Sequence, residues 1–189
     1  TFEEAAGLPL AGLTAYQVIT KALSVTDGDV VLVHAAAGGV GTFAVQLARH
    51  AGARVIGTAS ERNHAYLRDL GAEPVVYGDG LGERVRALAP EGVDAAFDTI
   101  GGDTLKLSAD LLAPGGRLAS IADGSVIALG GQYCFVRPDA ADLTRLTELV
   151  EQDVLTAHVQ ETFPLERAAD AFRVLEEGRT RGKIVVRVG

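Results

Sequence analysis

The stretch from Val30 to Arg49 constrains the fold more than any other part of the chain. It opens with a short apolar run, which is typical of a strand buried in a parallel sheet. It ends with apolar residues that recur on one face of a helix. Between them lies a turn of small residues, Ala36-x-Gly38-x-x-Gly41, which is the glycine fingerprint of dinucleotide sites with alanine in its first position.

Each part of this turn has a physical role in holding a dinucleotide. Gly38 lets the backbone come close to a pyrophosphate, and Gly41 lets the helix pack tightly on the strand. The helix start offers free N–H groups and the positive end of its dipole. An ordinary strand-to-helix turn is the alternative, but the order strand, turn, helix favours cofactor binding at Ala36, Gly38 and Gly41.

The chain around this unit alternates between strand and helix. The spacing predicts six strands, at 30–33, 53–60, 74–77, 93–98, 117–122 and 132–136. It predicts helices at 15–23 (capped by Thr14), from the fingerprint to about 52, and at 61–70, 81–88, 102–112 and 138–150. We therefore predict a doubly wound α/β Rossmann fold with a six-stranded parallel sheet in the order 3-2-1-4-5-6, and a ligand across the carboxyl ends of the strands.

The last part of the chain has a different pattern. A helix is predicted at 166–177, and a final strand at 183–188 that lies too far from the sixth strand to be an obvious member of the same sheet. We expect this strand to belong to another lobe. The predicted division is a cofactor domain with an N-terminal linker helix at 1–160, and a helix-strand tail at 161–189.

Composition excludes several classes of partner. The net charge is −8 with no basic cluster, which argues against nucleic acid and anionic membranes as partners. Cys134 is the single cysteine and the four histidines are scattered, so we predict no disulfide and no metal site. No apolar run is long enough to span a bilayer, and the predicted location is the cytoplasm. The chain starts at Thr1 and contains no methionine, so we expect it to be a processed chain or an excised piece.

The end of the second predicted strand indicates which cofactor binds. NAD sites place a carboxylate there, about 20 residues after the glycines, to hold the ribose 2′-OH. Here that position is Ala59, and Ser60, Arg62 and Asn63 follow, of which the guanidinium suits a phosphate. We therefore predict NADPH rather than NADH. Glu61 speaks against this preference, and an exposed helix start is the alternative interpretation of the segment.

Three stretches together carry a family resemblance: FEEAAGLPLAGLTAY at 2–16, HAAAGGVG at 34–41 and RTRGKIV at 179–185. The chain resembles the zinc-independent quinone oxidoreductase branch of the medium-chain dehydrogenase/reductase family over essentially its whole length. Its low lysine content and high alanine and arginine content resemble proteins of GC-rich bacteria. The resemblance implies a cofactor domain without the β-barrel lobe that supplies most of the substrate pocket, and a tail that would normally join that missing catalytic lobe.

The resemblance also implies roles for individual residues in binding the cofactor. Gly38, Gly39 and Val40 resemble the pyrophosphate loop, and Ser60, Arg62, Asn63 and Tyr77 the adenosine end. Residues expected near the nicotinamide and its ribose are Thr14, Thr99, Ile100, Gly101, Ile121, Ala122, Phe135 and Val136. Each of these positions also has a plain interpretation as core or turn.

The sequence predicts no catalytic residue. Asp98 and Asp103 flank a turn, where carboxylates mostly cap or face solvent. His34 is more typical of a packed residue than of a proton donor, and Cys134 lies in an apolar strand. Relatives that act as enoyl reductases of polyketide and fatty-acid synthases carry a lysine where this chain has Thr104, with Lys106 two residues on, which disfavours that activity.

We therefore expect an NADPH-dependent oxidoreductase that passes hydride to an activated carbonyl, alkene or quinone of a small molecule. Two alternatives stay open: a non-catalytic NADPH-binding sensor or scaffold, and a zinc-dependent alcohol dehydrogenase-like enzyme with its ligands in the missing lobe. The family usually pairs its sixth strand with a symmetry mate, so the resemblance implies a homodimer through 132–136. An apolar strand exposed at a sheet edge would otherwise be a liability.

Overall fold

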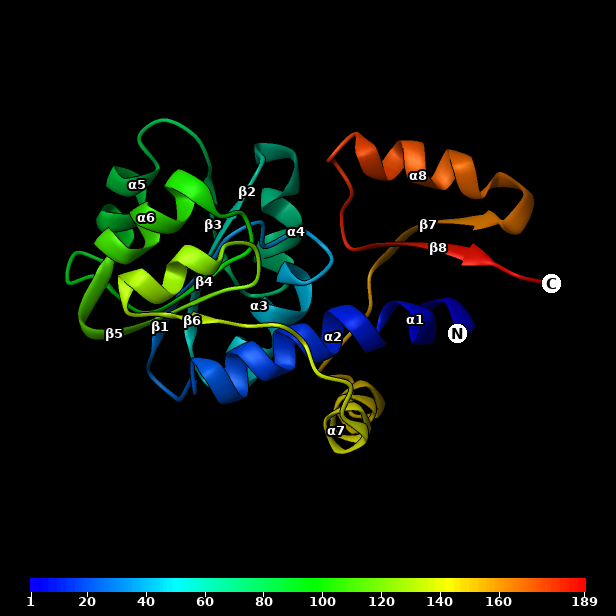
Figure 1. Cartoon of the computed structure of the whole chain (residues 1–189), viewed down its shortest axis with the longest axis horizontal. Helices are drawn as coiled ribbons and strands as arrows, with labels where there is room; N and C mark the ends of the chain where they lie inside the picture. The colour runs from blue at the N-terminus through cyan, green and yellow to red at the C-terminus, as the bar shows by residue number, and fades with distance from the viewer.

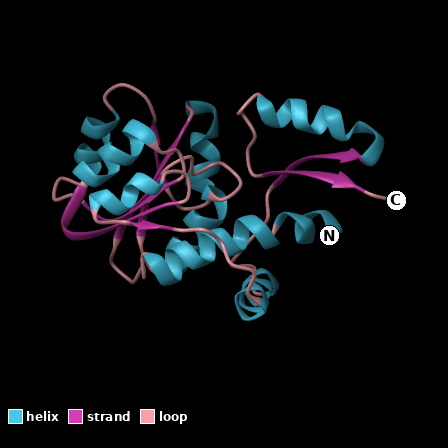
Figure 2. Ribbon diagram, in the orientation of Figure 1, coloured by secondary structure: helices cyan, strands magenta, loops and turns pink.

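The computed structural model describes all residues, 1–189, and its main body is a six-stranded sheet with helices on both faces (Figures 1 and 2). The strands are parallel throughout and run in the order β3-β2-β1-β4-β5-β6, which confirms the predicted topology. They are β1 (Val30–Val33), β2 (Arg54–Ala59), β3 (Glu73–Val76), β4 (Val93–Asp98), β5 (Leu112–Ser120) and β6 (Gln132–Tyr133).

The helices that cover this sheet form two layers. The first layer contains α2 (Pro9–Tyr16), the π-helical η1 (Gln17–Ala22), α3 (Gly41–His50), η2 (Glu61–Asn63) and α4 (His64–Asp69), and the second contains α5 (Leu81–Leu88), α6 (Gly102–Asp110) and η3 (Gly124–Leu129). α7 (Ala140–Glu151) packs against the outer side of α2 rather than on the sheet (Figure 1). Successive strand residues point to opposite layers, so Val31 and Val33 of β1 join one core and Leu32 the other. This double burial explains why β1 is an unbroken apolar run.

The tail forms a separate small unit beside the main sheet (Figure 1). β7 (Val159–Pro164) and β8 (Lys183–Arg187) pair in parallel as a two-stranded sheet, joined by η4 (Leu165–Arg167) and α8 (Ala168–Glu176). The last strand therefore lies outside the main sheet, as expected. β7 was not predicted because Gln160, Glu161 and Thr162 occupy its middle, so it contains no apolar run. It crosses the predicted boundary between residues 160 and 161, and the division into two domains stays a prediction.

The N-terminal segment corrects the prediction that Thr14 caps a helix at 15–23. The structure instead has α1 (Phe2–Gly7), followed by α2 at 9–16 and η1 at 17–22, and Pro9 occupies the first turn of α2, where proline is favoured. Thr14 lies inside α2 and its hydroxyl donates to the carbonyl oxygen of Leu10 at 2.7 Å. Threonine hydroxyls serve either as caps or in such bonds to the preceding turn, and because α2 already begins at Pro9, Thr14 lies in the helix interior, where only the second role is open to it.

The fifth and sixth strands also differ from prediction. β5 begins at Leu112 rather than at 117 and ends at Ser120, with an irregular register beside Val93, so the expected turn at 114–116 lies within the strand. β6 ends at Tyr133 rather than at 136. Its partner β5 stops at Ser120, whose carbonyl accepts one last bond from Cys134, so no ladder continues to Phe135.

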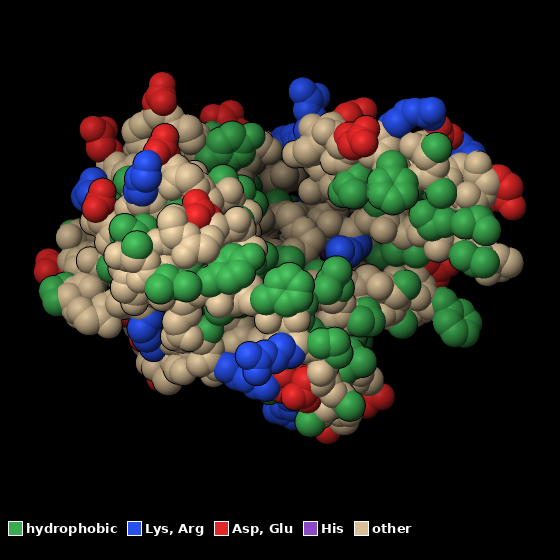
Figure 3. Space-filling view, in the orientation of Figure 1, with side chains coloured by type: hydrophobic (Ala, Val, Ile, Leu, Met, Phe, Trp, Pro, Cys, Tyr) green, Lys and Arg blue, Asp and Glu red, His purple; other side chains and the backbone are tan.

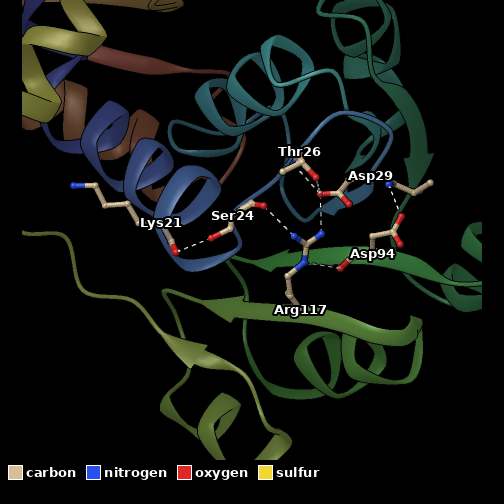
Figure 4. A network of polar contacts seen from close by, with 7 residues as sticks. Lys21, Ser24, Thr26, Asp29, Asp94 and Arg117 are labelled. Atoms are coloured by element: carbon tan, nitrogen blue, oxygen red, sulfur yellow. Dashed lines mark hydrogen bonds and ion pairs between the residues drawn. The ribbon is translucent and has the colours of Figure 1, made fainter.

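Arg117 ties together the amino ends of the central strands (Figure 4). Its Nη2 lies 2.7 Å from Oδ2 of Asp29, its Nη1 donates to the carbonyl of Ser24 at 3.0 Å, and its Nε donates to the carbonyl of Asp94 at 3.3 Å. Asp94 in turn accepts the N–H of Val30 at 2.8 Å. This network holds the edge of the sheet opposite the carboxyl ends.

None of the helices in the structure combines the length and the apolar character needed to cross a bilayer.

Candidate cofactor-binding site

A cleft of about 830 Å³ opens at the carboxyl ends of β1 to β4, between the sheet and the tail (Figure 3). Its place agrees with the rule that ligands of doubly wound sheets bind where the strand order reverses. Six residues predicted from the sequence line it: Gly38, Ser60, Arg62, Asn63, Tyr77 and Ile100. The remaining predicted residues do not line this cleft.

The glycine turn is packed too closely for side chains. A Cβ on Gly41 would lie 2.3 Å from the carbonyl oxygen of Ala35 and 2.7 Å from Cα of Ala36, so the start of α3 rests directly on the turn. Ala36 itself is fully buried, and Ala35 adopts a φ of 46° to make the reversal. Ala36 and Gly41 therefore determine the shape of the turn by their packing and do not line the cleft.

The start of α3 presents unused hydrogen-bond donors. The backbone N–H groups of Gly39, Val40 and Gly41 donate to no acceptor in the protein, whereas the next N–H, from Thr42, bonds the carbonyl of Gly38 at 3.0 Å. Free N–H groups at a helix N-terminus bind phosphate groups. Because Gly39 and Val40 directly follow the cleft residue Gly38 in the chain, this turn fits a dinucleotide pyrophosphate.

His34 lies beneath the cleft in a directed chain of hydrogen bonds. The Ser108 hydroxyl donates to the carbonyl of Thr104 at 2.8 Å, so it accepts from Nε2 of His34 at 2.9 Å. Nδ1 of His34 then accepts the Thr58 hydroxyl at 3.3 Å, and that hydroxyl oxygen accepts the N–H of Ala35 at 3.1 Å. Burial lowers the pKa of His34 to about 4, which its neighbour Asp98 opposes only in part. His34 is therefore a neutral structural residue, as its sequence context indicated.

The outer end of the cleft is the expected adenosine end. Ala59 closes β2 without a carboxylate, and the Asn63 amide donates to the Ser60 hydroxyl at 3.4 Å. Nη2 of Arg62 donates to the carbonyl of Arg179 at 2.7 Å, so the tail closes this end. The tail loop from Gly178 to Thr180 lines the cleft, and no role had been assigned to it. The motif RTRGKIV was the one signal that pointed there.

The loops after β4 and β5 are held by one buried carboxylate. Asp98 accepts the N–H groups of Ile100 and Gly101 at 3.1 and 3.0 Å and the Ser120 hydroxyl at 2.6 Å. Ser120 in turn accepts the N–H of Ala122 at 3.1 Å, and the neighbouring Thr99 hydroxyl donates to the carbonyl of His34 at 2.9 Å. Thr99, Gly101, Ile121 and Ala122 therefore sit in rigid loops beside the cleft, and only Ile100 lines it.

Three predicted residues gather elsewhere. Thr14, Phe135 and Val136 line a second cavity of about 670 Å³ between η1 and the segment after β6. The structure brings these three together, far along the chain from one another, but not to the main cleft. Their assignment to the nicotinamide end stays a prediction.

The comparisons with known proteins agree with this geometry. Residues 70–186 match the family described as zinc-binding dehydrogenase. No group of three or more His, Cys, Asp or Glu side chains in the structure is placed to hold a metal ion, so the residues present do not fit a zinc site.

Individual relatives share this part of their length. A 2-haloacrylate reductase from Burkholderia sp. is 37% identical over 206 residues, covering 96% of this chain and 62% of the relative. The quinone oxidoreductase structure from Coxiella burnetii is 39% identical with a TM-score of 0.87, covering 98% of this chain and 60% of that one. The polyketide synthase system protein NorB of Streptomyces orinoci is 34% identical over 98% of this chain but only 9% of its own length. The chain thus spans about 60% of the two single-enzyme relatives.

Proposed function

Because this chain belongs to the zinc-binding dehydrogenase family, in the quinone oxidoreductase-like branch of the medium-chain dehydrogenases/reductases, we propose that it is the NADPH-binding domain of an oxidoreductase. The observation that carries this proposal is the row of free N–H groups at Gly39, Val40 and Gly41, at the mouth of a cleft that ends at Arg62. A pyrophosphate bound at the free N–H groups and a ribose 2′-phosphate bound at Arg62 would give both of these anion-binding positions a partner. The two sites belong to successive βα units, as in other dinucleotide folds.

The residues of this chain bind and orient the cofactor. The α3 start holds the pyrophosphate, and the exposed Arg62 guanidinium reaches the 2′-phosphate beside Ala59, which offers no repelling carboxylate. Asp98 and Ser120 hold the loops expected to face the nicotinamide ribose. When bound, the cofactor supplies a hydride for a reduction.

We propose an activated alkene, carbonyl or quinone of a small molecule as the acceptor. The names of the relatives support this class, since a haloacrylate and a quinone both contain an electron-poor carbon–carbon double bond conjugated to a carbonyl. Thr104 lies where the family resemblance implies a lysine in the enoyl reductases of polyketide synthases, so the likeness to NorB does not by itself extend this class to the enoyl groups of such synthases.

We also propose a homodimer formed through β6, in the cytoplasm. β6 is the edge of the main sheet, and Tyr133 and Phe135 are exposed along it and the segment that follows, where Figure 3 shows a band of apolar side chains. Pairing with a second copy would cover this edge. A monomer in light scattering at micromolar concentration would contradict the proposal.

Thermal unfolding with matched concentrations of NADPH and NADH tests the cofactor proposal. A ligand at about 100 times its dissociation constant adds roughly 2.7 kcal/mol to the free energy of unfolding. We expect NADPH to raise the melting temperature more than NADH. Gly41→Ala, which disturbs the turn, serves as the non-binding control. An equal melting temperature with and without either nucleotide would overturn the proposal.

A further inference from the structure

Lys183, the first residue of β8, runs between two glycines toward the glycine turn. A Cβ on Gly7 would lie 3.4 Å from Cγ of Lys183, and a Cβ on Gly39 would lie 3.0 Å from its Cδ and 3.4 Å from its Nζ. The aliphatic stem therefore occupies a slot between α1 and the turn before α3. Gly39 is outside the fingerprint positions 36, 38 and 41, and its missing side chain makes room for this lysine.

The backbone fixes Lys183 in this place. The N–H of Gly182 donates to the carbonyl of Ala37 in the turn at 2.9 Å, and the N–H of Lys183 donates to the carbonyl of His158 at 2.8 Å. Gly182 has a φ of 65°, and a Cβ on it would lie 2.2 Å from the His158 carbonyl oxygen. The tail is thus hydrogen-bonded to the glycine turn directly before the lysine.

The ammonium group of Lys183 has no partner in the structure. The other two lysines of the chain are paired, Lys21 with Asp142 at 2.6 Å and Lys106 with Asp103 at 2.9 Å. Lys183 makes no ion pair or side-chain hydrogen bond, is half-buried, and lies beside the positive end of α3. Burial lowers the pKa of its amine, and no carboxylate opposes that effect. A cation in such a place is stabilised by an anion shared with the free N–H groups of the turn.

We propose that Lys183 contacts the pyrophosphate of the bound dinucleotide, so that the C-terminal tail supplies part of the cofactor site. This inference rests on the proposed function and deepens it. The free N–H groups and the ammonium converge on one anion from two segments more than 140 residues apart in the sequence. Since NADPH and NADH share the pyrophosphate, Lys183 contributes to the affinity for both, whereas Arg62 distinguishes them.

Calorimetric titration of the 189-residue chain tests this assignment with four ligands: NADPH, NADH, ADP-ribose and 2′-AMP, which lacks the pyrophosphate. Lys183→Met keeps the stem and removes the charge. We expect this variant to lower the affinity for NADPH, NADH and ADP-ribose by a common factor of about 10 to 100, which corresponds to the loss of one charge-assisted hydrogen bond. The affinity for 2′-AMP should change by less than about twofold. Arg145→Met removes one positive charge from an exposed ion pair on α7, away from the cleft, and should leave all four affinities unchanged.

The outcomes separate this inference from the proposed function. If the wild-type chain binds the dinucleotides and Lys183→Met binds them with the same affinities, the role of Lys183 is overturned and NADPH binding stands. A loss for NADPH alone, or an equal loss for 2′-AMP, would also overturn it, because the lysine would then act at another subsite or on the fold. Wild-type protein that binds no dinucleotide would overturn both. Lys183→Gln, a second neutral variant, replaces Lys183→Met if circular dichroism shows that the latter is unfolded.

Discussion

Nε2 of His34 lies 2.9 Å from the Ser108 hydroxyl and joins the end of β1 to α6 directly beneath the cleft. Because this hydroxyl already donates to Thr104, the bond requires the imidazole to be neutral with its proton on Nε2. A charged imidazole would place a second proton against the Thr58 hydroxyl and leave a buried charge without a carboxylate in contact. The floor of the cleft therefore depends on the protonation state of one residue.

Acid should destabilise the protein through this histidine. The pKa of His34 falls from its ordinary 6.5 to about 4 in the folded chain, so between these values the unfolded chain binds more protons and stability falls as pH decreases. The loss approaches about 3 kcal/mol at pH 4 and is absent above pH 7. Urea unfolding at several pH values should show a flatter dependence in His34→Asn than in wild type. Equal slopes in the two proteins would contradict the assignment.

Gly41→Ala should damage the turn itself. The added Cβ meets the backbone of Ala35 and Ala36, which cannot move as a flexible side chain would, so we expect a loss of about 1–3 kcal/mol in unfolding free energy and of nucleotide binding. Gly124→Ala is the matched control, since a Cβ there meets nothing within 4 Å. Urea unfolding of both variants measures the difference, and equal stabilities would show that the close packing of α3 on the turn is not needed.

Arg117→Met should destabilise the fold without touching the cleft. It leaves the mostly buried Asp29 carboxylate without its cation and removes the bonds to Ser24 and Asp94, at an expected cost of about 1–3 kcal/mol. Arg145→Met breaks an exposed pair with Glu148 and should cost under about 0.5 kcal/mol. Chemical denaturation compares the two. A similar small loss in both would mean that the network in Figure 4 contributes little.

Arg62→Ala should change which nucleotide binds best. The exposed guanidinium has one bond, to the carbonyl of Arg179, and its other donors are free for a phosphate. We expect the affinity for NADPH to fall by about tenfold or more and that for NADH to stay within about twofold, since only NADPH carries the 2′-phosphate. Fluorescence titration with both nucleotides is the measurement. Parallel losses would place Arg62 outside the phosphate subsite.

Sequence patterns predicted the sheet well where burial is two-sided. β4 and α5 have the bounds expected from their apolar residues, and the strand order follows from where the glycine fingerprint lies. The predictions failed where the length or the existence of a strand depends on its pairing with a partner strand or on a surface that is exposed. β6 is shorter than its apolar run because β5 ends at Ser120, and the polar β7 is held by its pairing with β8.

The predicted site residues show the same difference between what local patterns predict and what tertiary packing determines. Gly38, Ser60, Arg62, Asn63, Tyr77 and Ile100 could be placed at the cleft from local motifs, since each follows the carboxyl end of a strand or begins a helix. Thr14, Phe135 and Val136 form a second cavity because the short β6 lets the chain turn toward η1. Local spacing carries no information on that turn.

The sequence alone determined the parallel sheet, its order and the glycine turn, because these depend on residue spacings within one βα unit or its neighbours. Only the tertiary structure decided that the tail closes the cleft, with Arg179 against Arg62 and Lys183 in the slot left by Gly39. The physical reason is distance along the chain. A contact between residues more than 100 positions apart depends on how whole elements pack, and neither partner shows its role in its own local pattern.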